Sequence, residues 1–216
     1  MNAENIRLYR NLYTSHSTLV THRERRELSR ILKHFLSEKK YGVENPEAFL
    51  KRNLEIMDIL LNEIGLGKAA VISFLLMEPV EKQYIDVKDV DKLFSTAISP
   101  IMIGLQRVKE LYQKNVALES ENFRKLLLTM AEDVRVILII VAVRLQTMRN
   151  LESYPTDEQQ QIARESSFLY APLAHRMGLY KVKTELEDLS LKFTDREIYK
   201  AIARKLNETK RSRDAY

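Results

Sequence analysis

Apolar side chains recur at helical spacing along most of this 216-residue chain. In the first clear segment they follow an i, i+3, i+4, i+7 pattern, which is typical of one apolar helix face. These residues are Leu28, Ile31, Leu32 and Phe35. Thr21 precedes them and Glu24 stands three residues after it, an order typical of a capping box. The pattern therefore predicts a helix that begins directly after Thr21.

A second helix is predicted to start at Asn45 and Pro46, which suit an N-cap and the first helical position. Its apolar positions are Leu50, Leu54, Met57 and Leu61. We expect this helix to end at residues 65–67, Gly-Leu-Gly, because glycine readily adopts the left-handed backbone of a helix cap.

Prolines divide the next part of the chain into shorter pieces. Residues 69–77 predict a short apolar helix, and Pro79 disfavours its continuation because proline has no backbone N–H. Residues 86–93 predict another helix. Pro100 is expected to separate that helix from the next one, or to kink it.

A long helix is predicted over residues 120–151. Within it, residues 136–143 are apolar without interruption and rich in β-branched side chains, so they also fit a buried strand. We favour a helix, because the periodicity before and after this run is helical and no second strand is available for pairing. A helix that is apolar on all sides is expected at the centre of a fold.

Two further capping boxes are predicted to start the last helices, at residues 156–159 and 194–197, and Pro155 ends the segment before the first of them. Gly and Pro number only 5 each, fewer turn formers than a sheet-rich fold of this length needs. The predicted fold class is therefore all-α, a bundle of about nine or ten helices.

Composition narrows the classes of function. There is no cysteine, which excludes a disulfide scaffold, a cysteine nucleophile and a cysteine-ligated zinc site. The longest apolar run, residues 136–143, is far shorter than the roughly 20 residues of a spanning helix. The N-terminal residues lack the apolar core of a signal peptide. We therefore expect a cytoplasmic protein without a membrane partner.

Charge gives little support for nucleic-acid binding. The formal net charge is +5, and residues 200–216 alone carry six basic and two acidic side chains. A solvated helix end that runs into a linker explains this excess better than a nucleic-acid site does. The tyrosines form no stacking stripe with basic residues, and the four histidines are scattered without metal-ligand spacing.

One motif carries a family resemblance. Residues 170–179 read Tyr-Ala-Pro-Leu-Ala-His-Arg-Met-Gly-Leu, and residues 183–189 read Lys-Thr-Glu-Leu-Glu-Asp-Leu. This resembles the RelA/SpoT signature Tyr-Ala-Pro-Leu-Ala-His-Arg-Leu-Gly followed by Lys-x-Glu-Leu-Glu-Asp-Leu. Residues 144–151 resemble the family's Arg-Leu-His-Asn-Met-Arg-Thr-Leu, and shorter matches occur at residues 63–67 and 161–166. The resemblance covers about residue 25 to the end of the sequence.

The resemblance implies the N-terminal hydrolase domain of such a protein, an all-α fold of the HD superfamily. In active members this domain removes pyrophosphate from the 3′ position of ppGpp with the help of Mn²⁺. A synthetase domain and regulatory domains follow it. We expect residues 1–195 to form a degenerate HD domain. Residues 196–216 are expected to form a terminal helix and basic linker toward a synthetase domain that is absent here.

The family's metal and catalytic residues are mostly replaced in this sequence. Alignment on residues 65–67 and 144–145 puts the four metal-ligand positions at Arg52, Met77, Glu78 and Val143. The family's catalytic Glu-Asp pair falls at Glu81 and Lys82, and its basic nucleotide-contacting segment falls at residues 43–46, which lack basic side chains. Among the four metal-ligand positions, only Glu78 offers the oxygen donor that Mn²⁺ prefers. We therefore assign no catalytic, metal-binding or cofactor-binding residue and expect no cofactor.

The remaining charges suggest a structural replacement for the metal. Arg52 would lie where the cation was, and Glu78 and Glu81 share a helical face if their helix continues past Pro79. One hypothesis is that Arg52 pairs with Glu78 or Glu81 in place of the metal. The alternative is that Arg52 points into solvent.

Three functions follow from this sequence. The favoured one is a catalytically inactive, ppGpp-hydrolase-like regulatory domain of a RelA/SpoT-type GTP pyrophosphokinase of the stringent response. Its partner would be the adjacent synthetase domain, contacted through residues 170–189, in which Glu187 and Asp188 are candidates. A guanine nucleotide is a further candidate ligand. The alternatives are an active or altered Mn²⁺-dependent ppGpp hydrolase and a helical module that contacts RNA or the ribosome.

Overall fold

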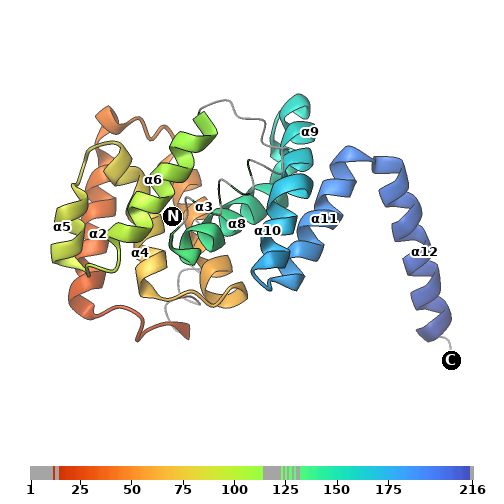
Figure 1. Ribbon diagram of the computed structural model, residues 1–216, viewed down its shortest axis with the longest axis horizontal. Coiled ribbons are helices and arrows are strands. Elements are labelled where there is room, and N and C mark those ends of the chain that lie inside the picture. Colours follow the sequence, from red (N-terminus) through yellow and green to blue (C-terminus); the bar gives the residue numbers. More distant parts are fainter. Residues whose placement is uncertain are drawn as a thin grey trace. The chain divides into compact units, whose positions relative to one another are not determined.

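The computed structural model describes residues 12, 15–113, 123, 125, 127, 129 and 132–214, with the side chains of residues 39, 207, 208 and 210–214 left aside. Within these residues all regular structure is helical and no strand is formed, so the all-α prediction is confirmed (Figure 1). The α-helices are α2 (His22–Ser37), α3 (Pro46–Asp58), α4 (Lys68–Glu81), α5 (Val87–Leu93), α6 (Ser99–Gln113), α8 (Val134–Arg149), α9 (Thr156–Glu165), α10 (Ala171–Arg176), α11 (Tyr180–Thr194) and α12 (Arg196–Asp214).

Four short helical segments connect or extend these helices. Two are 3₁₀ turns, η1 (Lys39–Tyr41) and η3 (Leu151–Ser153). Two are π-helical, η2 (Ile59–Glu63) directly after α3 and η4 (Ser166–Tyr170) between α9 and α10. The π segments prolong their helices without a break, so residues 46–63 and 156–176 each form one continuous helical stretch.

The chain divides into two compact units, and the division falls inside α8. Described residues up to 113 and from 125 to 143 belong to the first unit, while residue 123 and residues from 144 onward belong to the second. Among the described residues no helix is long and apolar enough to cross a membrane.

The first unit begins with the capping box that the sequence predicts. The Thr21 hydroxyl accepts the Glu24 backbone N–H at 3.2 Å, and the Glu24 carboxylate accepts the Thr21 backbone N–H at 2.8 Å. The same carboxylate accepts a hydrogen bond from the Lys68 ammonium, at 2.7 Å, at the start of α4. Glu24 therefore both caps α2 and links it to α4.

Helix α3 also starts and ends as predicted. The side chain of Asn45 accepts the backbone N–H of Ala48 at 3.0 Å, and Pro46 occupies the first turn. After η2, Gly65 adopts a φ of 79°, a backbone conformation that side-chain-bearing residues rarely take. This glycine turns the chain toward α4.

The prediction that the helix over residues 69–77 ends before Pro79 is wrong, because α4 continues to Glu81 with Pro79 buried inside it. The helix ends where Gln83 takes a positive φ of 56° and the Tyr84 backbone N–H bonds the Pro79 carbonyl at 2.9 Å. This is the bonding of a left-handed helix cap. Val80 packs against the apolar core, so tertiary burial offsets the hydrogen bond that proline cannot donate.

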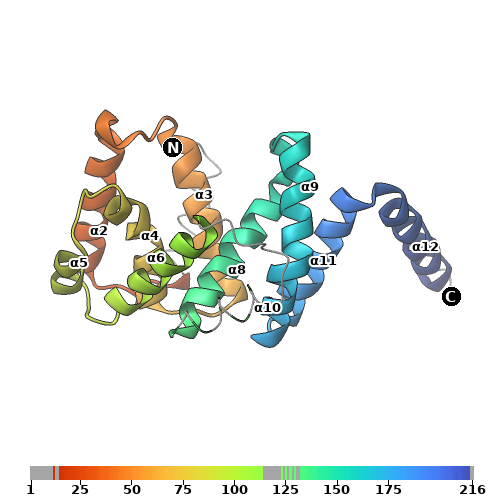
Figure 2. The ribbon, with the colours of Figure 1, turned by 45° about the horizontal axis from the view of Figure 1, so that its top comes forward.

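A tight apolar core holds α2, α4, α5 and α6 together, and these helices lie side by side in Figures 1 and 2. Its fully packed members are Ile31, Ile72, Leu76, Val90, Ile98 and Met102. Helices α5 and α6 are separate, as one of the two alternatives for Pro100 predicted, and Pro100 lies in the first turn of α6. Later in α6, Gly104 leaves room for Val136, since an added Cβ would lie 2.6 Å from a Val136 methyl group.

The long helix predicted over residues 120–151 is not continuous, although α8 is the apolar helix expected in place of a strand. Glu132 and Asp133 form bends, and α8 begins at Val134. The Asp133 carboxylate accepts the backbone N–H of Arg135 at 2.9 Å and also pairs with the Arg135 guanidinium. These Arg135 contacts hold the pKa of Asp133 below its usual value. This local bonding competes with helix continuation.

In the second unit both predicted capping boxes are wrong. Thr156 is already the first helical residue of α9, so Pro155 occupies the N-cap position, where its hydrocarbon ring cannot accept a hydrogen bond. Before α12 the cap is Asp195, whose carboxylate accepts the Ile198 backbone N–H at 3.0 Å, while Thr194 still belongs to α11. In each case the helix boundary lies one residue away from the predicted threonine cap.

Candidate functional site

The positions that the resemblance assigns to the metal and to catalysis all lie in the first unit, on α3, α4 and α8, with Lys82 directly after the end of α4. On α3 Arg52 is exposed, whereas the next residue, Asn53, is buried. On α4 Met77 and Glu78 are half-buried and Glu81 is exposed. Val143, half-buried on α8, contributes only an aliphatic side chain. The helices expected to carry the site are therefore present, but the side chains differ in chemistry.

Arg52 does not replace the metal by pairing with the α4 carboxylates, so that hypothesis is wrong. Among the described residues Arg52 forms no ion pair with Glu78 or Glu81. Glu81 instead pairs with Lys109 of α6. The physical reason is the orientation of α3, which turns Asn53 and Leu54 into the protein and leaves Arg52 in solvent. The alternative, Arg52 pointing outward, is the one observed.

The residues at these positions do not fit a divalent cation. Arginine keeps its positive charge and has no lone pair to donate, methionine offers a soft sulfur, and valine offers nothing. Glu78 alone supplies an oxygen. Across the part of the chain that the structure describes, no group of three or more His, Asp or Glu side chains is arranged to hold a metal ion.

The second unit places the residues after Val143 in a structural network. The Arg144 guanidinium lies 3.0 Å from the Glu165 carboxylate and 3.2 Å from the Tyr170 hydroxyl, and Gln161 donates to Glu165 at 3.0 Å. Side-chain exposure is 14% for Arg144 and 11% for Glu165, so this pair is largely removed from water. The family-like segment at residues 144–151 thus contributes to packing through its arginine.

The motif that carries the resemblance is mostly internal to the second unit. Its buried members are Tyr170, Ala171, Leu173, Ala174 and Leu186. Gly178 has a φ of 76° and lets the chain turn from α10 into α11. Glu187 pairs with Lys183 one helical turn away, and Asp188 is exposed. The motif is therefore explained mainly by packing and by this turn.

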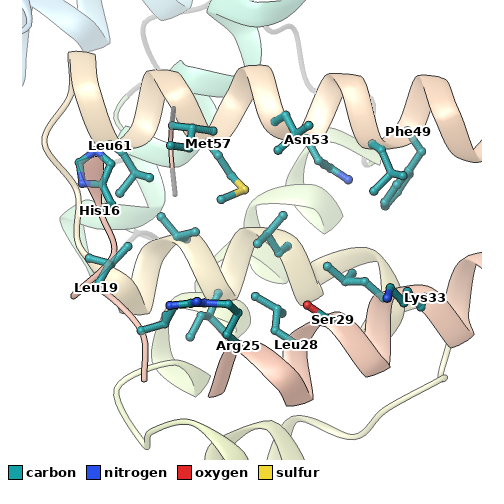
Figure 3. Close-up of a pocket in the computed structure, with 18 of the residues that line it drawn as sticks. His16, Leu19, Arg25, Leu28, Ser29, Lys33, Phe49, Asn53, Met57 and Leu61 are labelled. Atoms are coloured by element: carbon teal, nitrogen blue, oxygen red, sulfur yellow. The ribbon is translucent and has the colours of Figure 1, made fainter. Parts of the chain in front are cut away.

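The first unit contains a cavity that sequence reasoning did not predict. It measures about 470 Å³ and lies among α2, α3 with η2, and α4 (Figure 3). Its described lining is mainly apolar, with leucine the commonest residue, and Asn53 is the most deeply buried polar residue at 7% exposure. A cavity arises from imperfect packing between helices, and periodicity along one helix cannot predict it.

Comparison with known proteins agrees with this architecture. A family model described as "HD domain" matches residues 34–180, more than half of the chain. The GTP pyrophosphokinase of Myxococcus xanthus is 34% identical over 175 residues, which are 79% of this chain and 23% of that protein. A probable guanosine-3′,5′-bis(diphosphate) 3′-pyrophosphohydrolase of Synechocystis sp. is 32% identical over 157 residues, 72% of this chain and 21% of that protein.

A third relative is the bifunctional (p)ppGpp synthase/hydrolase SpoT of Escherichia coli, 36% identical over 131 residues, 60% of this chain and 19% of that protein. The helical fold and the matched family model define an HD-domain protein. Within that class the chain is a RelA/SpoT-type HD domain. It spans about a fifth of the length of these curated relatives.

Proposed function

We propose that this HD domain no longer hydrolyses ppGpp and instead regulates a RelA/SpoT-type GTP pyrophosphokinase. The observation that supports the loss of hydrolysis is the donor chemistry at the four metal positions. Three of them, Arg52, Met77 and Val143, carry no hard donor, and Mn²⁺ requires several oxygen or imidazole ligands. Without the metal there is no activated water to attack the phosphate.

The proposed partner is a synthetase domain in the same parent chain. We propose that residues 1–195 form the degenerate HD domain and that residues 196–216 lead toward the synthetase. The curated relatives are several times longer than the matched segment, which is consistent with further domains. Control of such a neighbour requires two arrangements of the domain pair, and a signal that stabilises one of them.

Helix α12 offers a surface suited to this contact. Ile198, Ile202 and Leu206 are spaced four residues apart, on one side of the helix. Their exposed fractions are 50%, 45% and 64%, high for large apolar side chains. Residues 170–189, the contact region that the sequence suggested, expose less apolar surface because most of their apolar side chains are buried. Tyr180 is an exception at 64% exposure.

The test is synthetase activity of the full-length parent protein. Ile198→Ser with Ile202→Ser should change ppGpp synthesis, because the substitutions remove the apolar contact that holds one domain arrangement. Glu197→Gln, on the same helix, is the control. Synthesis unaffected by the serine pair would contradict regulation through α12.

A calorimetric titration with ppGpp, with and without Mn²⁺, tests whether the domain retains a guanine-nucleotide site.

A further inference from the structure

The cavity of the first unit contains a buried polar group without a partner. Asn53 is 7% exposed, and its carboxamide forms no hydrogen bond with any described residue. Figure 3 shows this amide pointing from α3 into the space that faces α2. Buried amides are almost always hydrogen-bonded, so an unpaired amide directed into a cavity indicates a missing hydrogen-bonding partner.

The rest of the described lining limits what that partner can be. The walls are mostly apolar, with Leu28 and Leu32 contributed by α2 and Leu54 and Met57 contributed by α3. Lining residues run from Phe49 to Leu61, a helical length of about 18 Å. The volume of about 470 Å³ falls within the range of small-molecule sites, roughly 300–1,000 Å³. The space therefore suits an elongated apolar molecule.

Charge along the same lining is one-sided. Arg25 and Lys33 both line the cavity from α2, and none of the described lining residues is acidic. Lys33 is exposed, so its ammonium lies at the solvent side of the cavity. A carboxylate is stable beside such cations near water, whereas deep burial beside Asn53 would be unfavourable for a charge.

We propose that this cavity is a binding site for a medium-chain carboxylate that carries a neutral hydroxyl or carbonyl group on its chain. The carboxylate lies at the end of the cavity near Arg25. The hydrocarbon chain packs against the leucines, and the neutral polar group hydrogen-bonds the Asn53 amide. This site is separate from the degenerate metal positions and does not depend on the loss of hydrolysis.

The experiment compares calorimetric binding of 10-hydroxydecanoate, decanoate and decylamine to this chain. Wild type should bind hydroxydecanoate roughly tenfold more tightly than decanoate, since only the former satisfies the buried amide. Decylamine, which places a cation beside Arg25, should bind more weakly than either. Arg25→Gln should weaken binding of both carboxylates, while the control Lys88→Gln on α5 should bind like wild type.

Asn53→Leu provides the sharpest variant. It should abolish the preference for hydroxydecanoate over decanoate and raise the melting temperature of the unliganded protein, because an unpaired buried amide is removed. A folded Asn53→Leu protein that keeps the preference would overturn the proposal. The proposal would also be overturned if the wild-type protein bound neither hydroxydecanoate nor decanoate, or bound the two with equal affinity. A lower melting temperature of Asn53→Leu would show that the amide is a structural group and also overturn it.

Discussion

Glu81 of α4 pairs with Lys109 of α6, so the carboxylate at the family's catalytic Glu position is neutralised by a cation within the fold. The Lys109 side chain is 52% exposed and the Glu81 side chain is 24% exposed, and an ion pair open to solvent in this way contributes little to stability. Lys109→Gln should therefore lower the free energy of unfolding by less than about 1 kcal/mol. The loss should shrink at high salt, in urea titrations with Lys88→Gln as the control. A loss that does not depend on salt would contradict an exposed ion pair.

Glu24 should make stability depend on pH at the acidic end. Burial raises the pKa of its carboxyl, but the hydrogen bonds from Lys68 and Thr21 outweigh this, and the net pKa lies below the usual value. Such a group stabilises the fold when it is ionised, and this contribution is lost as the pH falls through the depressed pKa.

Glu24→Gln should therefore cost about 1–2 kcal/mol of unfolding free energy at neutral pH. The difference from wild type should narrow below about pH 4.3. Chemical denaturation across this pH range is the measurement, with exposed Glu44→Gln as the control. A difference that stays constant down to low pH would mean that the ionised carboxylate is not what stabilises the contact.

Gly104 should resist substitution because of its contact with Val136. A Cβ at residue 104 would lie 2.6 Å from a methyl group of Val136, a stiff, fully buried side chain. Gly104→Ala should cost about 1–3 kcal/mol, although alanine favours helices over glycine. In a double-mutant cycle, Val136→Ala should relieve much of that cost. Strictly additive losses would show that the two residues do not interact.

Two ion pairs of the second unit, Arg144–Glu165 and Arg149–Glu185, should differ in strength because they differ in burial. Glu165→Ala leaves the buried Arg144 without its carboxylate and should cost about 3–5 kcal/mol. The comparison is Glu185→Ala, which breaks an Arg149 pair whose members are 34% and 37% exposed, and should cost at most about 1 kcal/mol. Urea denaturation measures both losses of unfolding free energy. Equal losses would contradict the claim that burial sets the strength of these ion pairs.

Sequence predicted the fold where local chemistry decides the structure. The Thr21–Glu24 capping box, the Asn45 cap and the left-handed Gly65 depend only on neighbouring residues, and all three were predicted. Pro79 was misjudged because its cost is offset by burial against other helices. The caps at residues 156 and 194 were each placed one residue away, since several polar residues compete for a helix start.

For the candidate site, sequence predicted residue chemistry but not orientation. The replaced metal positions can be seen by alignment, yet whether Arg52 faces Glu78 depends on the rotation of α3 against its neighbours. That rotation turns Arg52 outward and Asn53 into the cavity. The spacing of apolar residues along a helix does not show whether a cavity forms beside it. The position of Asn53 in this cavity could therefore not be predicted from the sequence.

The most direct test of the central claim measures Mn²⁺ binding and ppGpp hydrolysis by this chain beside a variant with restored ligands. That variant carries Arg52→His, Met77→His, Glu78→Asp and Val143→Asp, with Lys82→Asp to restore the catalytic pair. We predict that the natural sequence binds no stoichiometric Mn²⁺ and releases no pyrophosphate, while the restored variant gains Mn²⁺ binding. Stoichiometric Mn²⁺ and turnover by the natural sequence, abolished by Glu78→Gln, would contradict the account and make this domain an active hydrolase.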